Sequence, residues 1–175
     1  QGKDIWVGGS IGPTGKLAQP YGPLSETELF DTFVEQAGYL LNGGVDLFVI
    51  ETQFDLTEAT TAINAVRTLD KSIPLVCSLS YDRGTRTMMG VKPEGMWENI
   101  GSLKGVDIVG VNCGKSLEDN LAVLKKLHAL SDKPIWFKPN AGLPSLDSEG
   151  HTVFSILPET MGEYVPEWLS AGASV

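Results

Sequence analysis

The stretch that decides the fold class is Val106-Asp107-Ile108-Val109-Gly110-Val111-Asn112-Cys113-Gly114, residues 106–114. It is almost wholly apolar up to Val111, which is the pattern of a parallel β-strand that is covered on both faces. Polar residues and a glycine follow at once, and a helix start comes next at Ser116. A buried strand that passes through a short loop into a helix predicts an α/β protein.

The same succession of an apolar strand and a helix recurs along the whole chain. Successive strands lie roughly thirty residues apart, as in consecutive βαβ units. The predicted strands are 5–9, 47–51, 75–80, 106–112 and 135–138, and the predicted helices are 25–41, 56–69, 93–103, 116–130 and 158–170. The sequence therefore predicts a single α/β domain over residues 1–175.

A short pattern marks where strands begin. Gly44-Val45-Asp46 precedes the second strand and Gly105-Val106-Asp107 precedes the fourth, as a helix C-terminal glycine followed by a strand start. Residues 171–175 have the same character. Because a complete barrel needs about 250 residues, we expect an incomplete (βα)8 TIM barrel of five central βα units, with the first strands and the last strand missing. A five-stranded doubly wound sheet is the alternative, but no glycine-rich dinucleotide loop follows the first strand.

Composition narrows the classes of function. The 175 residues carry a formal net charge of −9, and no cluster of Lys and Arg suggests a nucleic-acid partner. No apolar run is long enough to span a bilayer, so no membrane association is expected. The two cysteines, Cys77 and Cys113, lie in separate predicted strands and form no disulfide framework. We therefore expect a cytoplasmic protein.

Polar side chains follow the predicted strands, and function in parallel α/β proteins collects at these carboxyl ends. Cys113 is the first reactive side chain after its strand, where a thiol can serve as a nucleophile or a metal ligand. The alternative is a small buried residue, since free cysteine is often buried. Cys77 lies inside the third strand, where a core position is expected.

Two charged residues follow other strands. Glu51 comes directly after four apolar residues and needs a partner, because an unpaired buried charge is costly. It is a candidate for binding a cationic substrate group, or else a structural acceptor. Lys138 ends the fifth strand and is a candidate for Schiff-base chemistry. We favour instead an ion pair between Lys138 and Glu51. Asp55 is expected to cap the next helix.

In this order, the strand-end motifs resemble those of the homocysteine-binding module of cobalamin-dependent methionine synthase, within the homocysteine S-methyltransferase family. The resemblance covers essentially the whole chain. The matching runs are Ser10-Ile11-Gly12-Pro13-Thr14-Gly15, Glu51-Thr52-Gln53-Phe54-Asp55, Gly84-Thr85-Arg86-Thr87-Met88-Met89-Gly90, Gly110-Val111-Asn112-Cys113-Gly114 and Lys138-Pro139-Asn140-Ala141-Gly142-Leu143-Pro144.

The resemblance implies a zinc enzyme that produces methionine. Zinc keeps the homocysteine thiol as the thiolate that attacks a methyl group. By resemblance, Cys113 is the catalytic residue and a zinc ligand, and Glu51 holds the substrate ammonium. Gly9, Ser10 and Gly12 line the homocysteine site, and Asn140 lies at its rim. The loop 12–15 resembles the corrinoid-dependent branch, which implies methylcobalamin as donor and partner domains or proteins that carry the corrinoid and methyltetrahydrofolate.

The sequence departs from the family in one respect. The family's other two zinc cysteines are adjacent in a Gly-Gly-Cys-Cys-Gly run on the final strand, and this sequence has no such run. We expect them beyond Val175, and we expect this chain alone to bind zinc weakly and to be inactive. Two further hypotheses remain: a Schiff-base lyase or aldolase-type barrel that uses Lys138, and an inactive relative that lacks the metal.

Overall fold

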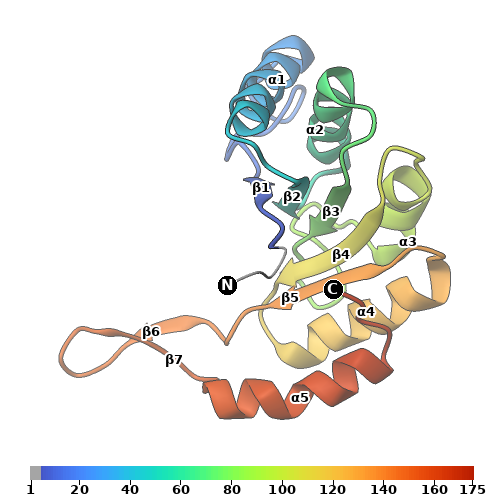
Figure 1. Cartoon of the computed structure of the whole chain (residues 1–175). Helices are drawn as coiled ribbons and strands as arrows, with labels where there is room; N and C mark the ends of the chain where they lie inside the picture. The colour runs from blue at the N-terminus through green and yellow to red at the C-terminus, as the bar shows by residue number, and fades with distance from the viewer. Residues whose placement is uncertain (1–4) are drawn as a thin grey trace.

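The computed structural model describes residues 5–175, so the first four residues of the predicted domain lie outside the described part. Parallel strands alternate with helices along the chain (Figure 1). The elements are β1 (Gly8–Ile11), α1 (Glu26–Asn42), β2 (Leu47–Gln53), α2 (Leu56–Leu69), β3 (Leu75–Leu79), α3 (Pro93–Met96), the π-helix η1 (Trp97–Gly101), β4 (Ile108–Cys113), α4 (Leu117–Leu130), β5 (Ile135–Pro139), β6 (Pro144–Leu146), β7 (Thr152–Phe154) and α5 (Pro158–Ser170).

The main sheet has five parallel strands in the order β1-β2-β3-β4-β5. Each new strand is added next to the previous one. A doubly wound sheet reverses its order at a switch point, so this topology excludes the doubly wound alternative. A strand order that follows the chain order is typical of a (βα) barrel.

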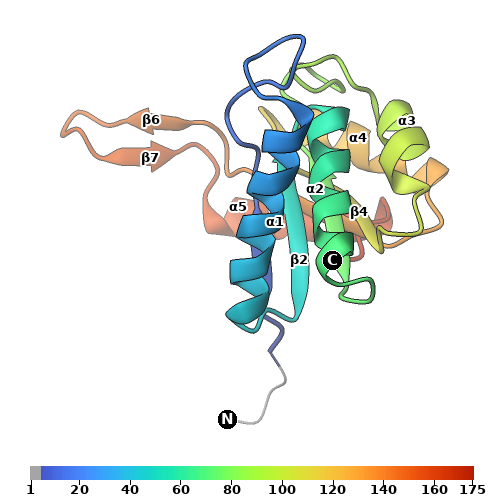
Figure 2. The same ribbon diagram turned by 90° about the horizontal axis from the view of Figure 1, so that it is seen from above.

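The helices cover the outer side of this sheet. Helices α1 and α2 lie side by side over β2 (Figure 2), and α4 and α5 lie beyond β4 and β5. The core between the two layers is apolar, with Phe33 of α1, Phe48 of β2 and Leu124 of α4 fully buried or nearly so. On β5, the Phe137 ring packs against Trp168 of α5 with ring centroids 5.1 Å apart.

Side chains cap the starts of two helices. Asp55 Oδ1 accepts the Glu58 N–H at α2, as predicted, and Ser25 and Glu28 form a capping box at α1. Each cap contributes about 0.5–2 kcal/mol. The repeated Gly-Val-Asp pattern has a shared role. Asp46 Oδ2 accepts the Val7 N–H just before β1, and Asp107 Oδ2 accepts the Leu75 N–H at the start of β3. Each aspartate therefore secures the start of the preceding strand.

Two sequence predictions need correction. The first strand begins at Gly8 rather than at residue 5. Gly8 pairs with Leu47, and the partner strand β2 begins at that residue. The predicted helix 93–103 is a short α-helix that widens into a π-helix at Trp97, whose carbonyl accepts the Ser102 N–H. Gly101 has no side chain and so leaves room for the Trp97 ring.

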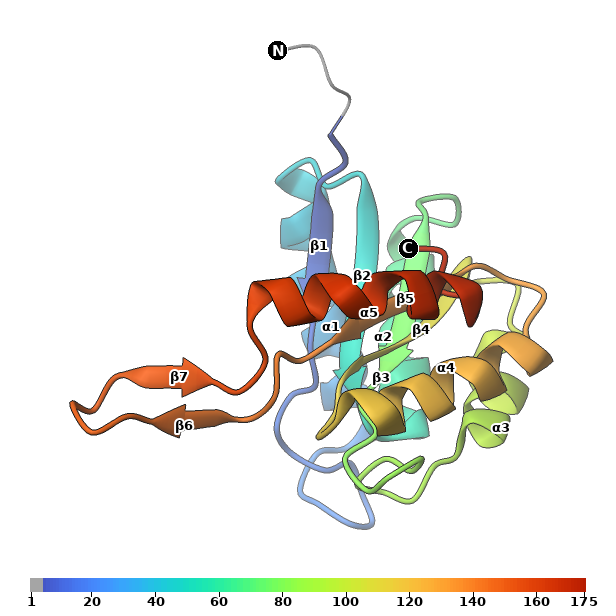
Figure 3. The same ribbon diagram turned by 90° about the horizontal axis from the view of Figure 1, so that it is seen from below.

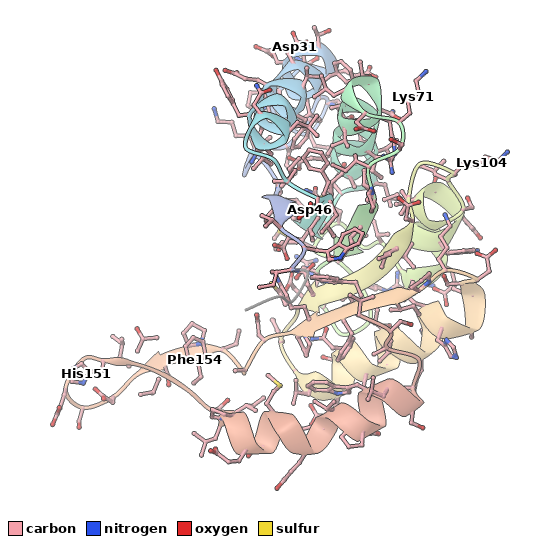
Figure 4. The ribbon with its side chains drawn as sticks, in the orientation of Figure 1. Asp31, Asp46, Lys71, Lys104, His151 and Phe154 are labelled. Carbon is pink, nitrogen blue, oxygen red and sulfur yellow. The ribbon has the colours of Figure 1, made fainter. Side chains whose placement is uncertain are left out.

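The antiparallel hairpin β6–β7 has no counterpart among the predicted elements, and it extends away from the body of the molecule (Figure 3). Its turn is built on Asp147, whose Oδ1 accepts the N–H groups of Glu149 and His151. The bond from the His151 backbone is the main reason that the pKa of Asp147 lies below its usual value. His151 lies at the outer end of the hairpin (Figure 4), remote from the strand ends of the main sheet.

The last residues pair with the sheet, as the pattern at residues 171–175 predicts. The Val175 N–H donates to Ile135 O, and the Phe137 N–H donates to Val175 O. These bonds cover part of the free edge of β5. Among the helices formed by residues 5–175, none has both the length and the apolar character needed to cross a membrane.

Candidate functional site at the strand ends

Three strands bring polar side chains together on the concave side of the sheet. Ser10 Oγ of β1 donates to Glu51 Oε1 of β2 at 2.8 Å, and Lys138 Nζ of β5 donates to Glu51 Oε2 at 2.5 Å. In a flat sheet β2 and β5 would lie about 14 Å apart, three strand spacings. The ion pair therefore depends on the curvature of the sheet. The predicted pairing of Glu51 with Lys138 is confirmed.

The ion pair is unevenly buried. The Glu51 side chain is 15% exposed, whereas that of Lys138 is 54% exposed. The carboxylate thus has partners on both oxygens and still faces the solvent-accessible end of the sheet. An ion-paired Lys138 differs from the desolvated, unpaired amine that Schiff-base chemistry requires, and so the lyase hypothesis gains no support from this geometry.

Cys113 ends β4 in an unusual backbone conformation. Its φ is +58°, and Thr52 on β2 has φ +62°. Left-handed backbone at a residue other than glycine costs of order 1–3 kcal/mol and persists only when the surroundings enforce it. Cys113 Sγ accepts a hydrogen bond from Asn112 Nδ2 at 3.2 Å and lies 3.9 Å from Thr52 Oγ1. Two strained residues from different strands therefore meet at the thiol.

Other contacts secure the loop after Cys113. Asn120 of α4 is buried, and its Nδ2 donates to Cys113 O at 2.5 Å. Gly114 has φ +82°, and a Cβ there would collide with the Asn120 amide. Asn140 is exposed, and its Nδ2 donates to Gly114 O at 3.3 Å. Asn140 thus lies beside the Cys113 loop, and its contact with substrate stays a prediction.

The glycine-rich loop after β1 has a different anchor. The N–H and Oγ1 of Thr14 donate to Glu58 Oε1 at 2.6 and 2.7 Å, and Glu58 is buried on α2. Gly12 has open space where a Cβ would project, whereas a Cβ at Gly9 would press on Leu40 and Val45. Gly9 therefore packs toward the helices, so any contact with substrate must come from its backbone. The substrate contacts of Gly9, Ser10 and Gly12 stay predictions.

The two cysteines have distinct surroundings. Cys77 of β3 is fully buried, and burial raises the pKa of its thiol to about 12. Its predicted core position is confirmed. Cys113 is partly exposed at the strand end.

This contrast predicts selective alkylation. Iodoacetamide at pH 8 is expected to modify Cys113 and to leave Cys77 unmodified, because the thiolate reacts and only about one Cys77 thiol in ten thousand is ionised at that pH. Mass spectrometry of tryptic peptides measures both sites. Full denaturation should expose Cys77 to the reagent and serves as the control, and rapid labelling of Cys77 in the folded protein would contradict the burial.

The donor set can be compared with the needs of zinc. Within residues 5–175, no group of three His, Cys, Asp or Glu side chains is placed to hold a metal ion. Cys113 is the one thiol at the strand ends, since Cys77 lies in the core. An open zinc site needs three protein ligands. The described residues alone therefore do not fit zinc.

Two surface hollows are lined neither by the ion pair nor by Cys113. One lies between α1 and α2, lined by Glu26, Thr27, Phe30, Thr61 and Asn64. The other lies at the base of the hairpin and begins at Lys115, next to the Cys113 loop. The charged and reactive side chains, Glu51, Lys138 and Cys113, lie instead at the strand ends of the sheet.

Sequence reasoning missed several residues of this region. The buried side-chain amide of Asn112 accepts hydrogen bonds from Thr52 and Ser78. Glu58 holds the loop after β1, and Asn120 holds the loop after Cys113. The available signal was a polar residue inside or next to an apolar strand. Such a residue must find a partner when it is buried.

A curved, parallel α/β sheet with a polar site at its carboxyl ends defines a partial (βα) barrel. The sequence model of the homocysteine S-methyltransferase family matches residues 1–175, and the chain belongs to that family. The family resemblance found in the sequence is thereby confirmed.

Solved structures agree on the fold. The apo form of the homocysteine methyltransferase MmuM from Escherichia coli matches with a TM-score of 0.73 and 22% identity, over 97% of this chain and 55% of that chain. Its metallated form gives a TM-score of 0.71 and 22% identity, over 97% and 54%. An isomerase from Streptomyces coelicolor A3(2) gives 0.52 and 12%, over 76% and 33%. The chain thus spans about half the length of the MmuM structures, and the partial TIM barrel is confirmed.

Proposed function

We propose that the protein transfers a methyl group to the sulfur of homocysteine. The observation that carries this proposal is the cluster of Ser10, Glu51 and Lys138 beside the Cys113 loop, at the strand ends of a homocysteine S-methyltransferase chain. Homocysteine carries an ammonium and a carboxylate at neutral pH. The paired Glu51 and Lys138 offer one group of each opposite charge.

Glu51 keeps capacity for the substrate. A carboxylate has about four acceptor positions, and Ser10 and Lys138 occupy one on each oxygen. The substrate ammonium takes a further position on Glu51, and Lys138, which is half exposed, is free to turn toward the substrate carboxylate. Backbone of Gly9 and Gly12 and the amide of Asn140 border the same site in this proposal.

The finer chemistry is also a proposal. If a zinc ion is bound, Cys113 would supply one of its sulfur ligands, and the metal would stabilise the substrate thiolate. The donor is methylcobalamin, because the loop 12–15 resembles the corrinoid-dependent branch. The partners are the corrinoid and methyltetrahydrofolate domains or proteins, and the product is methionine.

The test is a methyl-transfer assay with the intact polypeptide, homocysteine and methylcobalamin, and with mass spectrometry of the product. Formation of methionine that depends on both reactants supports the proposal. Consumption of a carbonyl substrate with a borohydride-trapped adduct on Lys138 would replace it with the lyase hypothesis.

A second candidate, which also agrees with the absence of a three-ligand group within residues 5–175, is a family member that does not hold the metal. Metal analysis separates the two. Stoichiometric zinc in the intact polypeptide supports the enzyme, and a metal-free, inactive polypeptide supports the second candidate.

The chain of residues 1–175 itself is expected to bind zinc weakly, with a dissociation constant well above the micromolar range, because one thiolate cannot replace three ligands. Isothermal titration with zinc in a non-chelating buffer measures this affinity. The Cys113→Ser variant is the matched control and should lower even the weak binding. Stoichiometric binding at sub-micromolar concentration would contradict the assignment of one ligand.

A further inference from the structure

We propose that Asn112 is a positioning residue that fixes Cys113 relative to Glu51, an inference that rests on the function proposed above. Asn112 is fully buried near the end of β4 and precedes the thiol. All four hydrogen-bonding positions of its side-chain amide are used. The partners come from β2, β3 and β4.

The first half of this network holds β2. The register between β2 and β3 shifts, since Ile50 pairs with Cys77 but Gln53 pairs with Leu79. Three residues of β2 therefore advance against two of β3, which is a bulge. Within it, the Thr52 N–H donates to Asn112 Oδ1 at 2.9 Å, and Asn112 Nδ2 donates to Thr52 Oγ1 at 2.8 Å.

The second half holds the thiol. Asn112 Nδ2 donates to Cys113 Sγ at 3.2 Å, while Ser78 Oγ of β3 donates to Asn112 Oδ1 at 2.6 Å. A backbone N–H can only donate, so the bond from Thr52 fixes which end of the amide is oxygen. This orientation directs the NH₂ group toward the sulfur.

Asn112 therefore joins two strained residues through one rigid group. Thr52 and Cys113 both have positive φ, and the surroundings must enforce such backbone. Glu51 directly precedes Thr52, and so its direction depends on the same bulge. One buried amide thus sets the distance between the carboxylate proposed to hold the substrate ammonium and the thiol.

The test separates the two functions of the amide by kinetics. In the intact polypeptide, Asn112→Ala is expected to lower kcat/KM for homocysteine by about 10–100-fold, the usual cost of removing a supporting contact, through both a lower kcat and a higher KM. Asn64→Ala is the control, because Asn64 is an exposed residue of α2 and has no part in the network around Asn112. Its kcat should stay within about twofold.

A second variant guards against misfolding. Glycine adopts a φ of +62° without strain, so Thr52→Gly combined with Asn112→Ala should restore the bulge and the KM. The kcat should remain low, because the contact with Cys113 is still absent. A merely structural Asn112 predicts recovery of both constants, which would overturn the proposal.

A crystal structure of Asn112→Ala gives an answer that does not depend on activity. We expect Thr52 or Cys113 to leave the left-handed region and Sγ to move. If both residues and Sγ keep their places, the proposal is overturned even when the enzyme is active. If they move, and the unaltered polypeptide transfers no methyl group, the positioning role of Asn112 stands and the proposed function fails.

Discussion

Serine in place of Cys113 is expected to lower kcat/KM for homocysteine by at least about a thousandfold, equivalent to about 4 kcal/mol of transition-state stabilisation. The thiolate is the form of cysteine that acts as nucleophile or metal ligand, and a serine hydroxyl is not ionised at neutral pH. Serine is similar in size and can occupy the same position beside Asn112 Nδ2 and Thr52. The loss should therefore come from chemistry and not from the fold. Steady-state kinetics of the intact polypeptide measure it.

The control is the other cysteine. Cys77→Ala removes a buried sulfur from the layer between β3 and the helices, which costs stability but leaves the strand ends in place. Its kcat per folded molecule should stay within about twofold of the original. Normal activity of the Cys113→Ser variant would contradict the proposed function.

Most of the fold follows from local signals in the sequence. Each apolar run became a strand, and α2 and α5 have the predicted bounds because Asp55 and Pro158 are start signals that act through their own backbone. The π-helix after Met96 did not follow, since it depends on how the Trp97 ring packs on Gly101. That packing is a tertiary property and leaves no periodic trace.

The candidate site also contains residues that the sequence predicts and residues that it does not. Glu51 was identifiable because a carboxylate after a buried strand must be paired, and Lys138 at a neighbouring strand end was a reasonable partner. The role of Asn112 was not visible, because its partners Thr52 and Ser78 lie on other strands and meet it only after the sheet curves. The left-handed backbone of Thr52 leaves no sequence signal either, since threonine rarely adopts it.

Gln in place of Glu51 is expected to raise the KM for homocysteine by about 30–1,000-fold, because loss of one partner from a largely buried charge contact costs about 2–4 kcal/mol. Glutamine keeps the shape and one acceptor oxygen for Ser10 but leaves the substrate ammonium and Lys138 without a counter-charge. The kcat should change less than KM, since Glu51 is proposed to hold the amino-acid end and not the sulfur. Initial rates over a range of homocysteine concentrations give both constants.

Two variants make this result specific to Glu51. Ser10→Ala removes one hydrogen bond to the carboxylate and should raise KM by less than Glu51→Gln does, because Glu51 keeps its charge and its contact with Lys138. Glu98→Gln changes an exposed glutamate on η1 and should leave both constants unaltered. If Glu51→Gln behaves like Glu98→Gln, the carboxylate serves only to pair Lys138, and the substrate ammonium binds elsewhere. If kcat falls with KM unchanged, Glu51 acts on the reacting sulfur, which would revise its place in the mechanism.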